Sequence, residues 1–252
     1  YIDSHCHLDL LKKHISVSEA VKAAKAQQVS HFINPATQQA NWQTLLNLKK
    51  TYSNIQIALG LHPCFIKHHI PEHLDELEKI IEQHAIPIIG EIGLDKRFKE
   101  TYKQQEIYFI AQLILAEKLK KPVIIHAVRA HADIIQTLKT QAFTQGGIIH
   151  AFYGSYEEAK QYINLDFALG IGGLITYPNN KKLRKVITQI PATSIVLETD
   201  SPDMQLYQQD GPYNQPANIP TIFSEICSLR TENPGELQQQ FWHNTHRSLN
   251  LV

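Results

Sequence analysis

The residues that carry the most chemical information in this chain are histidines and carboxylates that each follow, or stand within, a short apolar run. Neutral imidazole nitrogens and carboxylate oxygens are the usual protein ligands of zinc, manganese and nickel, whereas magnesium prefers oxygen alone. One tetrahedral ion needs four ligands, and this set exceeds that number, so the sequence predicts two divalent cations (Zn, Mn, Mg or Ni) per chain. The candidate metal ligands are His5, His7, Glu91, His126, His150 and Asp200.

Glu91 and Asp200 are the candidates for a direct part in catalysis. A bridging carboxylate is the usual way to hold two ions about 3.5 to 4 Å apart, and Glu91 is our candidate for that bridge. Two ions at this spacing suit hydrolysis of a phosphoester by metal-activated water. Asp200 could bind one ion and also accept the proton of the attacking water. Because only neutral histidines bind metal, we expect activity to fall as the pH drops through their titration.

Eight short apolar runs supply the strands that must position these side chains. They span residues 2–6, 30–34, 55–61, 87–94, 122–126, 147–151, 167–171 and 194–197. Segments with helical periodicity lie between them, for example 19–27, 41–50, 72–82 and 103–120. Ser16 with Glu19 forms a capping-box pattern, and Ser155 marks another helix start. This alternation predicts an α/β fold, a single (β/α)8 TIM barrel, with residues 1–252 forming one domain.

The candidate ligands fall where such a barrel has its active site, at the C-terminal ends of the strands. His5 and His7 close the first run, and because side chains alternate along a strand, both are expected to point the same way. Several ionisable groups at one buried rim would cost several kcal/mol each unless they bind metal or one another. The other ligands lie in or directly after later runs: Glu91, His126, His150 and Asp200.

Composition limits the classes of partner and compartment. Lys plus Arg equals Asp plus Glu at 24 each, so any contact with nucleic acid must be local. The three cysteines are scattered without a CxxC pair, which suits a reducing compartment, and no apolar run approaches the length of a membrane span. We therefore expect a cytoplasmic protein without membrane contact. A basic cluster follows the fourth run and could either touch a phosphate backbone or form a solvated helix start: Lys96, Arg97, Lys99 and Lys103.

Six segments together resemble the TatD family of metal-dependent deoxyribonucleases, within the amidohydrolase-type barrels, and are most similar to its YjjV-like branch. The segments span residues 3–7, 59–63, 90–95, 122–126, 150–152 and 197–202, and they follow the order of the family. The resemblance implies one ion held by His5, His7, Glu91 and Asp200, and a second held by Glu91, His126 and His150. It also implies that His62, Arg129 and Glu198 lie near the substrate phosphate or the activated water.

The same resemblance implies a deoxyribonuclease, of the 3′–5′ exonuclease type. We expect its DNA substrate to be single-stranded or to have frayed ends, because a base inside a duplex is poorly accessible to a narrow pocket. We also expect a monomer. Two departures from the family bear on substrate detail. The family often has an aromatic residue shortly after the Gly-Leu-Asp segment, where this chain reads Lys96-Arg97-Phe98, and Tyr153 stands where a small residue is usual.

Three alternatives to this interpretation stay open. The same barrel and metals could hydrolyse a cyclic amide, a lactone or a small phosphoester, although many enzymes acting on C–N bonds bridge their metals with a modified lysine where this chain has Glu91. A non-catalytic metal site would be closed by four ligands, which six candidates do not suggest. A metal-free proton-transfer enzyme would not need so many histidines beside the carboxylates.

Overall fold

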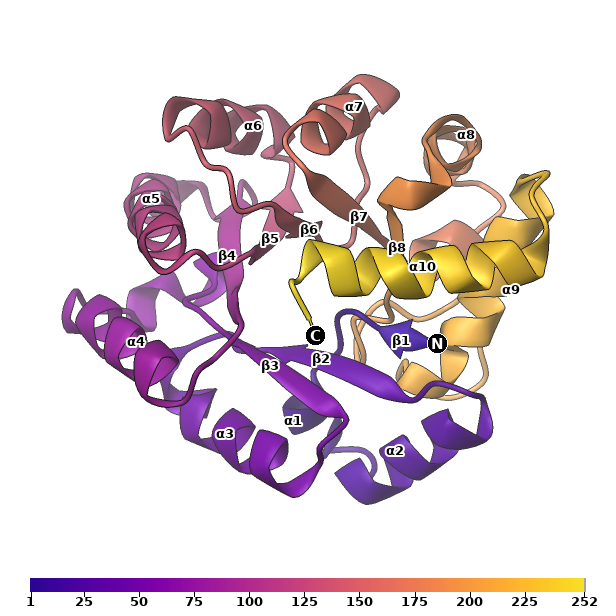
Figure 1. The fold of residues 1–252 in the computed structure, drawn as a ribbon, viewed down its shortest axis with the longest axis horizontal. Helices are drawn as coiled ribbons and strands as arrows, with labels where there is room; N and C mark the ends of the chain where they lie inside the picture. The colour runs from indigo at the N-terminus through magenta and orange to yellow at the C-terminus, as the bar shows by residue number, and fades with distance from the viewer. Residues whose placement is uncertain (252) are drawn as a thin grey trace.

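The computed structural model describes residues 1–251 and is built around eight parallel strands that pair in chain order. The (β/α)8 fold predicted from the sequence is confirmed. In Figure 1 the helices form a ring around the strands. The strands are β1 (Ile2–Asp3), β2 (His31–Pro35), β3 (Ile55–Leu59), β4 (Ile88–Asp95), β5 (Val123–Val128), β6 (Gly147–Ile149), β7 (Phe167–Ile171) and β8 (Ile195–Leu197).

The helices follow the strands, and their starts obey the capping rules that the sequence suggested. Ser16 and Ser155 both form complete capping boxes, the first with Glu19 and the second with Glu158. The helices are α1 (Leu8–Leu11), α2 (Val17–Ala26), α3 (Trp42–Thr51), α4 (Glu72–Gln83), α5 (Tyr102–Leu119), α6 (His131–Thr140), α7 (Tyr156–Asn164), α8 (Lys181–Gln189), α9 (Ile219–Leu229) and α10 (Pro234–Ser248). No helix within residues 1–251 is both long enough and apolar enough to cross a membrane.

The barrel interior is closed at one end by a layer of aliphatic side chains, which we call the floor. Each strand contributes one floor residue, and Leu249, just after α10, packs on the same layer. Figure 1 shows α10 lying across this end of the barrel, with the C-terminus near its centre. All floor residues are at most 4% exposed, so the floor is a packed core. Its strand members are Ile2, Ile33, Ala58, Ile88, Ile124, Ile148, Ala168 and Val196.

The seam between β1 and β8 is joined just beyond the end of β1. The Ser4 amide donates a hydrogen bond to the Leu197 carbonyl at 2.9 Å. The Thr199 amide and hydroxyl both donate to the buried Asp3 carboxylate, at 2.9 and 2.6 Å. These bonds tie the first strand to the segment that carries Asp200, so residues far apart in the sequence are fixed at one edge of the barrel.

Candidate metal centre

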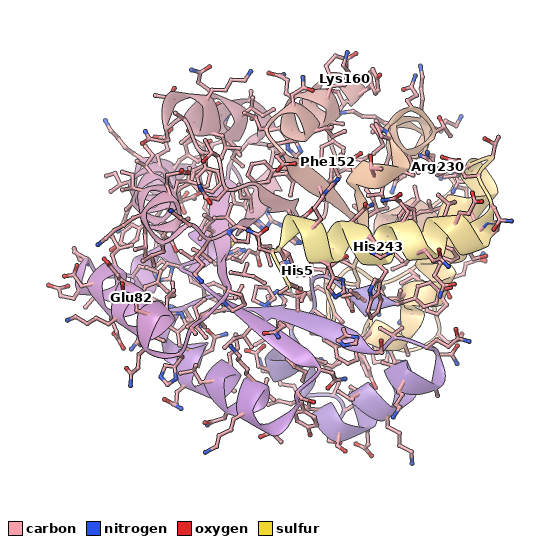
Figure 2. All side chains as sticks on the ribbon, viewed as in Figure 1. His5, Glu82, Phe152, Lys160, Arg230 and His243 are labelled. Atoms are coloured by element: carbon pink, nitrogen blue, oxygen red, sulfur yellow. The ribbon has the colours of Figure 1, made fainter. Side chains whose placement is uncertain are left out.

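A cavity of about 880 Å³ opens at the C-terminal ends of the strands, at the opposite end of the barrel from the floor. In Figure 2 His5 lies near the barrel centre, whereas Glu82, Lys160 and Arg230 lie at the periphery. His5 is fully buried, beneath the cavity. The remaining five candidate ligands line the cavity, so the structure brings together the whole set that the sequence predicted: His7, Glu91, His126, His150 and Asp200.

The Glu91 carboxylate is the centre of the cluster, and its two oxygens face different groups of histidines. Oε1 lies 2.9 Å from His126 Nδ1 and 3.0 Å from His150 Nε2. Oε2 lies 3.3 Å from His5 Nε2 and 3.7 Å from His7 Nε2. The side chain is only 2% exposed. One carboxylate therefore connects two sets of imidazoles, which is the geometry that a bridging ligand requires.

Within residues 1–251, two compact groups consist of predicted ligands, and each could hold one ion; two overlapping groups also occur, formed by His62, Cys64 and His126 and by His5, His150 and Glu198. His5, His7 and Asp200 offer atoms that lie within 4.8 Å of one another, and so do Glu91, His126 and His150. In the first cluster the Nε2 atoms of His5 and His7 are 3.2 Å apart, and they lie 3.5 and 3.6 Å from Asp200 Oδ1. Two buried imidazole nitrogens and a carboxylate oxygen directed at one point form a donor set that suits a divalent cation.

Burial and neighbouring side chains shift the pKa values of the groups in the cluster. Burial would raise the pKa of Glu91, but the imidazoles of His62, His150 and His5 outweigh it and hold the pKa well below its ordinary value. Burial, together with the charge of His150, holds the pKa of His5 well below its usual range, so this imidazole stays neutral and able to bind metal. Burial raises the pKa of Asp200 to about 6.

The local structure around His5 and His7 differs from the expected strand end. β1 ends at Asp3, so the prediction that these histidines close an inward-facing strand is wrong. His7 is instead the N-terminal cap residue of α1, and its amide donates to the Ser201 carbonyl at 2.8 Å. The two imidazoles meet because the chain bends after Asp3, where the bonds to Thr199 hold it, and not because of strand alternation.

β4 positions Glu91 through an irregularity that the sequence does not reveal. Ile88 belongs to the floor, yet Glu91, three residues later, also faces the barrel interior. Strict alternation would place the two on opposite faces. The register between β4 and β5 shifts between Ile89 and Ile92, and this shift allows both side chains to point inward.

Two further carboxylates stand behind the histidines of the second cluster. Asp95 is fully buried, and its Oδ2 lies 3.0 Å from His126 Nε2. Glu198 is also fully buried, and its Oε1 lies 3.6 Å from His150 Nδ1. Sequence analysis gave Asp95 no role. Asp95 lies four residues after Glu91 in β4. Strand alternation from Glu91 onward was therefore the signal that could have placed Asp95 on the same face of the strand as Glu91.

The three residues expected near the substrate occupy different depths. His62 lines the cavity and its Nε2 lies 3.0 Å from Glu91 Oε1, so it stands directly beside the ligand cluster. Arg129 lines the cavity, and its side chain forms no hydrogen bond or ion pair, with a helix carboxylate or any other group, within residues 1–251. Glu198 does not line the cavity, and the structure places it behind His150.

Two cavity residues were missed or assigned differently from sequence. His131, at the start of α6, lines the cavity and its Nδ1 lies 3.1 Å from the Tyr162 hydroxyl. Cys64, expected to be a packing residue, also lines the cavity and donates from Sγ to Asp95 Oδ2 at 3.3 Å. His131 does not follow an apolar run, and Cys64 lies beyond Pro63 in the segment after β3, so strand-end position did not identify either residue as part of the site.

The basic cluster after β4 is partly neutralised. Lys96 Nζ lies 2.7 Å from Asp133 Oδ2 on α6. The Arg97 guanidinium forms a two-pronged contact with Asp95, through Nε at 3.0 Å to both oxygens and Nη2 at 2.5 Å to one. Arg97 lines the cavity, so one of the expected phosphate contacts does lie at the site, but its charge is shared with Asp95.

Comparison with known proteins places this site in a family. The family model described as "TatD related DNase" matches residues 2–250. An Escherichia coli K12 protein described as the uncharacterized metal-dependent hydrolase YjjV is 34% identical over 254 residues, which cover 100% of this chain and 98% of that protein. The crystal structure of the E. coli TatD homologue YjjV superposes with a TM-score of 0.94 at 33% identity, covering 100% of this chain and 98% of the other. A TatD family hydrolase from Entamoeba histolytica shares the fold, with a TM-score of 0.83 at 20% identity and coverage of 100% and 98%.

Proposed function

The chain belongs to the TatD family, and from this membership and the geometry of its ligand cluster we propose that it is a two-metal phosphoester hydrolase that degrades DNA. Relatives in the family are described as metal-dependent hydrolases. The observation that carries the proposal is the position of Glu91, whose two oxygens face the two ligand clusters separately. A site for one ion would not need this arrangement.

In this proposal the ions and the protein have separate tasks. When bound, the two ions would draw negative charge from the phosphate and make water a stronger acid. His5, His7 and Asp200 hold one ion; Glu91 is shared, and His126 and His150 complete the second set. Asp200 is 16% exposed on its side chain, the most accessible of the ligand carboxylates, so it can also accept the proton that the attacking water loses.

Arg129 and His62 are proposed to receive the substrate phosphate. Arg129 has no partner among residues 1–251 and borders the cavity, so its guanidinium is available for a two-pronged contact with phosphate oxygens. His62 stands beside Glu91 and can donate a hydrogen bond toward the reacting group. Arg129→Lys keeps the charge and removes the fork, so it should raise KM about tenfold with little change in bound metal.

The shape of the site favours the end of a strand. The ligands lie between 0% and 9% exposed except for Asp200, at the base of a cavity that opens on one side. A base in the middle of a duplex cannot reach such a depth without being unpaired, whereas a free or frayed end can. We therefore propose exonucleolytic cleavage of single-stranded or frayed DNA, from the 3′ end as the family resemblance implies, by a cytoplasmic monomer.

The deciding experiment uses chelated protein and single-stranded DNA labelled at the 5′ or the 3′ end, with Mg²⁺, Mn²⁺ or Zn²⁺ added back. We expect stepwise shortening that depends on metal and that Asp200→Asn lacks although its circular dichroism is unchanged. Intact DNA with every metal would contradict the proposal and favour a small phosphoester or a cyclic amide as substrate. Near-normal turnover by Asp200→Asn would contradict the role of Asp200 as proton acceptor.

A further inference from the structure

The two ligand clusters differ in what lies behind their imidazoles. In the second cluster, His126 faces Glu91 with Nδ1 at 2.9 Å and Asp95 with Nε2 at 3.0 Å. His150 faces Glu91 with Nε2 at 3.0 Å, and its Nδ1 lies 3.6 Å from Glu198 Oε1. His126 therefore stands within hydrogen-bond distance of two carboxylates, Glu91 and Asp95. His150 Nδ1 faces Glu198 at ion-pair distance, and at 3.6 Å the two atoms are too far apart for a hydrogen bond.

The first cluster has no outer carboxylate within hydrogen-bond distance of its imidazoles, although a nitrogen of His5 lies within 4.8 Å of a Glu198 carboxylate oxygen. The Nδ1 atoms of His5 and His7 are buried and have no hydrogen-bond partner among residues 1–251. Both rings direct Nε2 toward Glu91 Oε2 and Asp200 Oδ1. Glu91 faces both clusters, whereas Asp95 contacts an imidazole of the second cluster only, so an effect that acts through Asp95 should reach only one of the two clusters.

Asp95 is held in place from several sides. The Arg97 amide donates to Oδ1 at 2.9 Å, and the Arg97 side chain and the Cys64 thiol contact the same carboxylate. Gln105 on α5 accepts a hydrogen bond from the Asp95 amide at 2.8 Å. Burial would raise the pKa of Asp95, but the bonds from His126 and Arg97 hold it well below its ordinary value. The carboxylate is thus a fixed, charged acceptor for the His126 N–H.

Glu198 is fixed by the neighbouring strand and by the chain after β6. Its Oε1 accepts a hydrogen bond from the Ala151 amide at 2.5 Å. Its Oε2 occupies space that a side chain on β7 would fill, because a Cβ atom on Gly170 would lie 2.0 Å from it. Glu198 is 0% exposed, and its Oε1 forms the one ion-pair contact that His150 Nδ1 makes within residues 1–251.

We propose that Asp95 and Glu198 are positioning residues for a single ion, the one held by Glu91, His126 and His150. Asp95 accepts the Nε2–H of His126, and Glu198 faces His150 Nδ1 at 3.6 Å. Each carboxylate thereby favours the tautomer whose opposite nitrogen is unprotonated, directs that nitrogen at the ion and makes it a stronger donor. The ion held by His5, His7 and Asp200 receives no such support. The inference rests on the two-ion site proposed above, and it predicts that the two ions can be weakened separately.

The test compares Asp95→Asn and Glu198→Gln with wild type and with a control, Asp9→Asn. Asp9 is 3% exposed, but its carboxylate accepts hydrogen bonds from the Asn34 and Asn41 amides and not from a ligand histidine. Bound manganese is measured at graded free Mn²⁺, and electron paramagnetic resonance distinguishes a coupled pair of Mn²⁺ ions from isolated ones. Circular dichroism and thermal unfolding verify that each variant is folded.

We expect wild type and Asp9→Asn to bind two ions and to give the signal of a coupled pair. Asp95→Asn and Glu198→Gln should each weaken one ion about 10- to 100-fold, retain the other, and give the signal of isolated Mn²⁺ at intermediate metal concentration. The two variants report independently, so Glu198→Gln decides the question if Asp95→Asn does not fold.

Unchanged binding of both ions in folded variants, or equal weakening of both, would overturn the inference while leaving the proposed hydrolase in place. Loss of an ion in Asp9→Asn would show that any buried negative charge has the same effect, and would also overturn it. Binding of a single ion by wild type would contradict the two-ion site itself. Two ions in wild type without cleavage of DNA would contradict the proposed activity alone.

Discussion

The floor and the mouth of this barrel are built on the same strands, two residues apart, and they are opposite in character. Ile124 and Ile148 belong to the floor, whereas His126, two residues further along β5, and His150, directly after β6, belong to the ligand clusters. The floor is a dry aliphatic layer that any similar set of apolar residues could fill. The mouth consists of buried acids and imidazoles that are stable together only because each one faces a partner or a cation.

The alternation of side chains along each strand therefore serves two purposes. It provides stability at the level of the floor and metal-binding groups at the level of the mouth. A change in the floor should alter how much protein is folded. A change in the mouth should alter what the folded protein binds. Variants at each level show whether the two are as separate as their geometry indicates.

Replacing Glu91 by Gln should abolish function while leaving the barrel folded. The shared carboxylate contributes to both clusters, so its loss should weaken both ions and lower turnover by a factor on the order of 10³ or more. Added metal should raise the midpoint of thermal unfolding of wild type, because it binds the native state, and should fail to raise that of the variant. Glu82→Gln, on the exposed surface of α4, is the control and should behave as wild type. A Glu91→Gln protein that still binds two ions would show that the carboxylate does not bridge them.

Replacing Ile124 by Ala should have the opposite result. The floor would lose a buried aliphatic side chain, and the free energy of unfolding should fall by about 2 to 5 kcal/mol, whereas Ile124→Val should cost about 0.5 to 1.5 kcal/mol. Urea unfolding measures this loss. The folded variant should bind the same number of ions and turn over at the same rate, and a loss of metal in folded protein would show that the floor and the mouth are coupled through His126.

His69 tests what a buried histidine does in the mouth region without a carboxylate partner. It follows η2 (Pro63–His68), its Nε2 donates to the His62 carbonyl at 3.0 Å, and its Nδ1 has no partner within residues 1–251. Burial lowers the pKa of His69 to about 4. The unfolded chain therefore binds more protons than the native state below the ordinary histidine pKa, so this contribution to stability is complete above about pH 6.5 and is lost as the pH falls toward 4.

The size of the effect should be on the order of 1 kcal/mol between pH 7 and about pH 5.5. His69→Phe removes the titrating group, so the difference in unfolding free energy between wild type and this variant should shrink as the pH falls over that window. Urea unfolding at each pH gives the comparison. A difference that stays constant with pH would show that burial does not lower the pKa of His69 in the native state.

Much of the fold could be predicted because parallel strands that are buried on both faces consist of consecutive apolar residues, which are recognisable in the sequence. β7 begins and ends at the expected residues, 167 and 171, and β4, β5 and β8 lie within two residues of their expected limits. The ligands were found because they are polar residues placed where those runs end. Both signals are local, so one sequence is enough to detect them.

The remainder depends on contacts that no local pattern contains. β1 stops at Asp3 because Thr199, nearly two hundred residues away, captures its carboxylate. Glu91 faces inward because of a register shift against β5. His131 reaches the cavity only through the position of α6 beside β5. In each case the partner is distant in the sequence, and the pairing is decided by packing.

The closed floor also has a consequence for traffic through the barrel. The floor residues are at most 4% exposed and none of them lines the cavity, so the cavity has no exit through the barrel axis. A polymer that enters end first therefore cannot continue through the floor, and a released fragment must leave on the side of the cavity. For an enzyme that degrades a strand, this geometry favours distributive over processive cleavage. The strand would dissociate after each cut and bind again before the next.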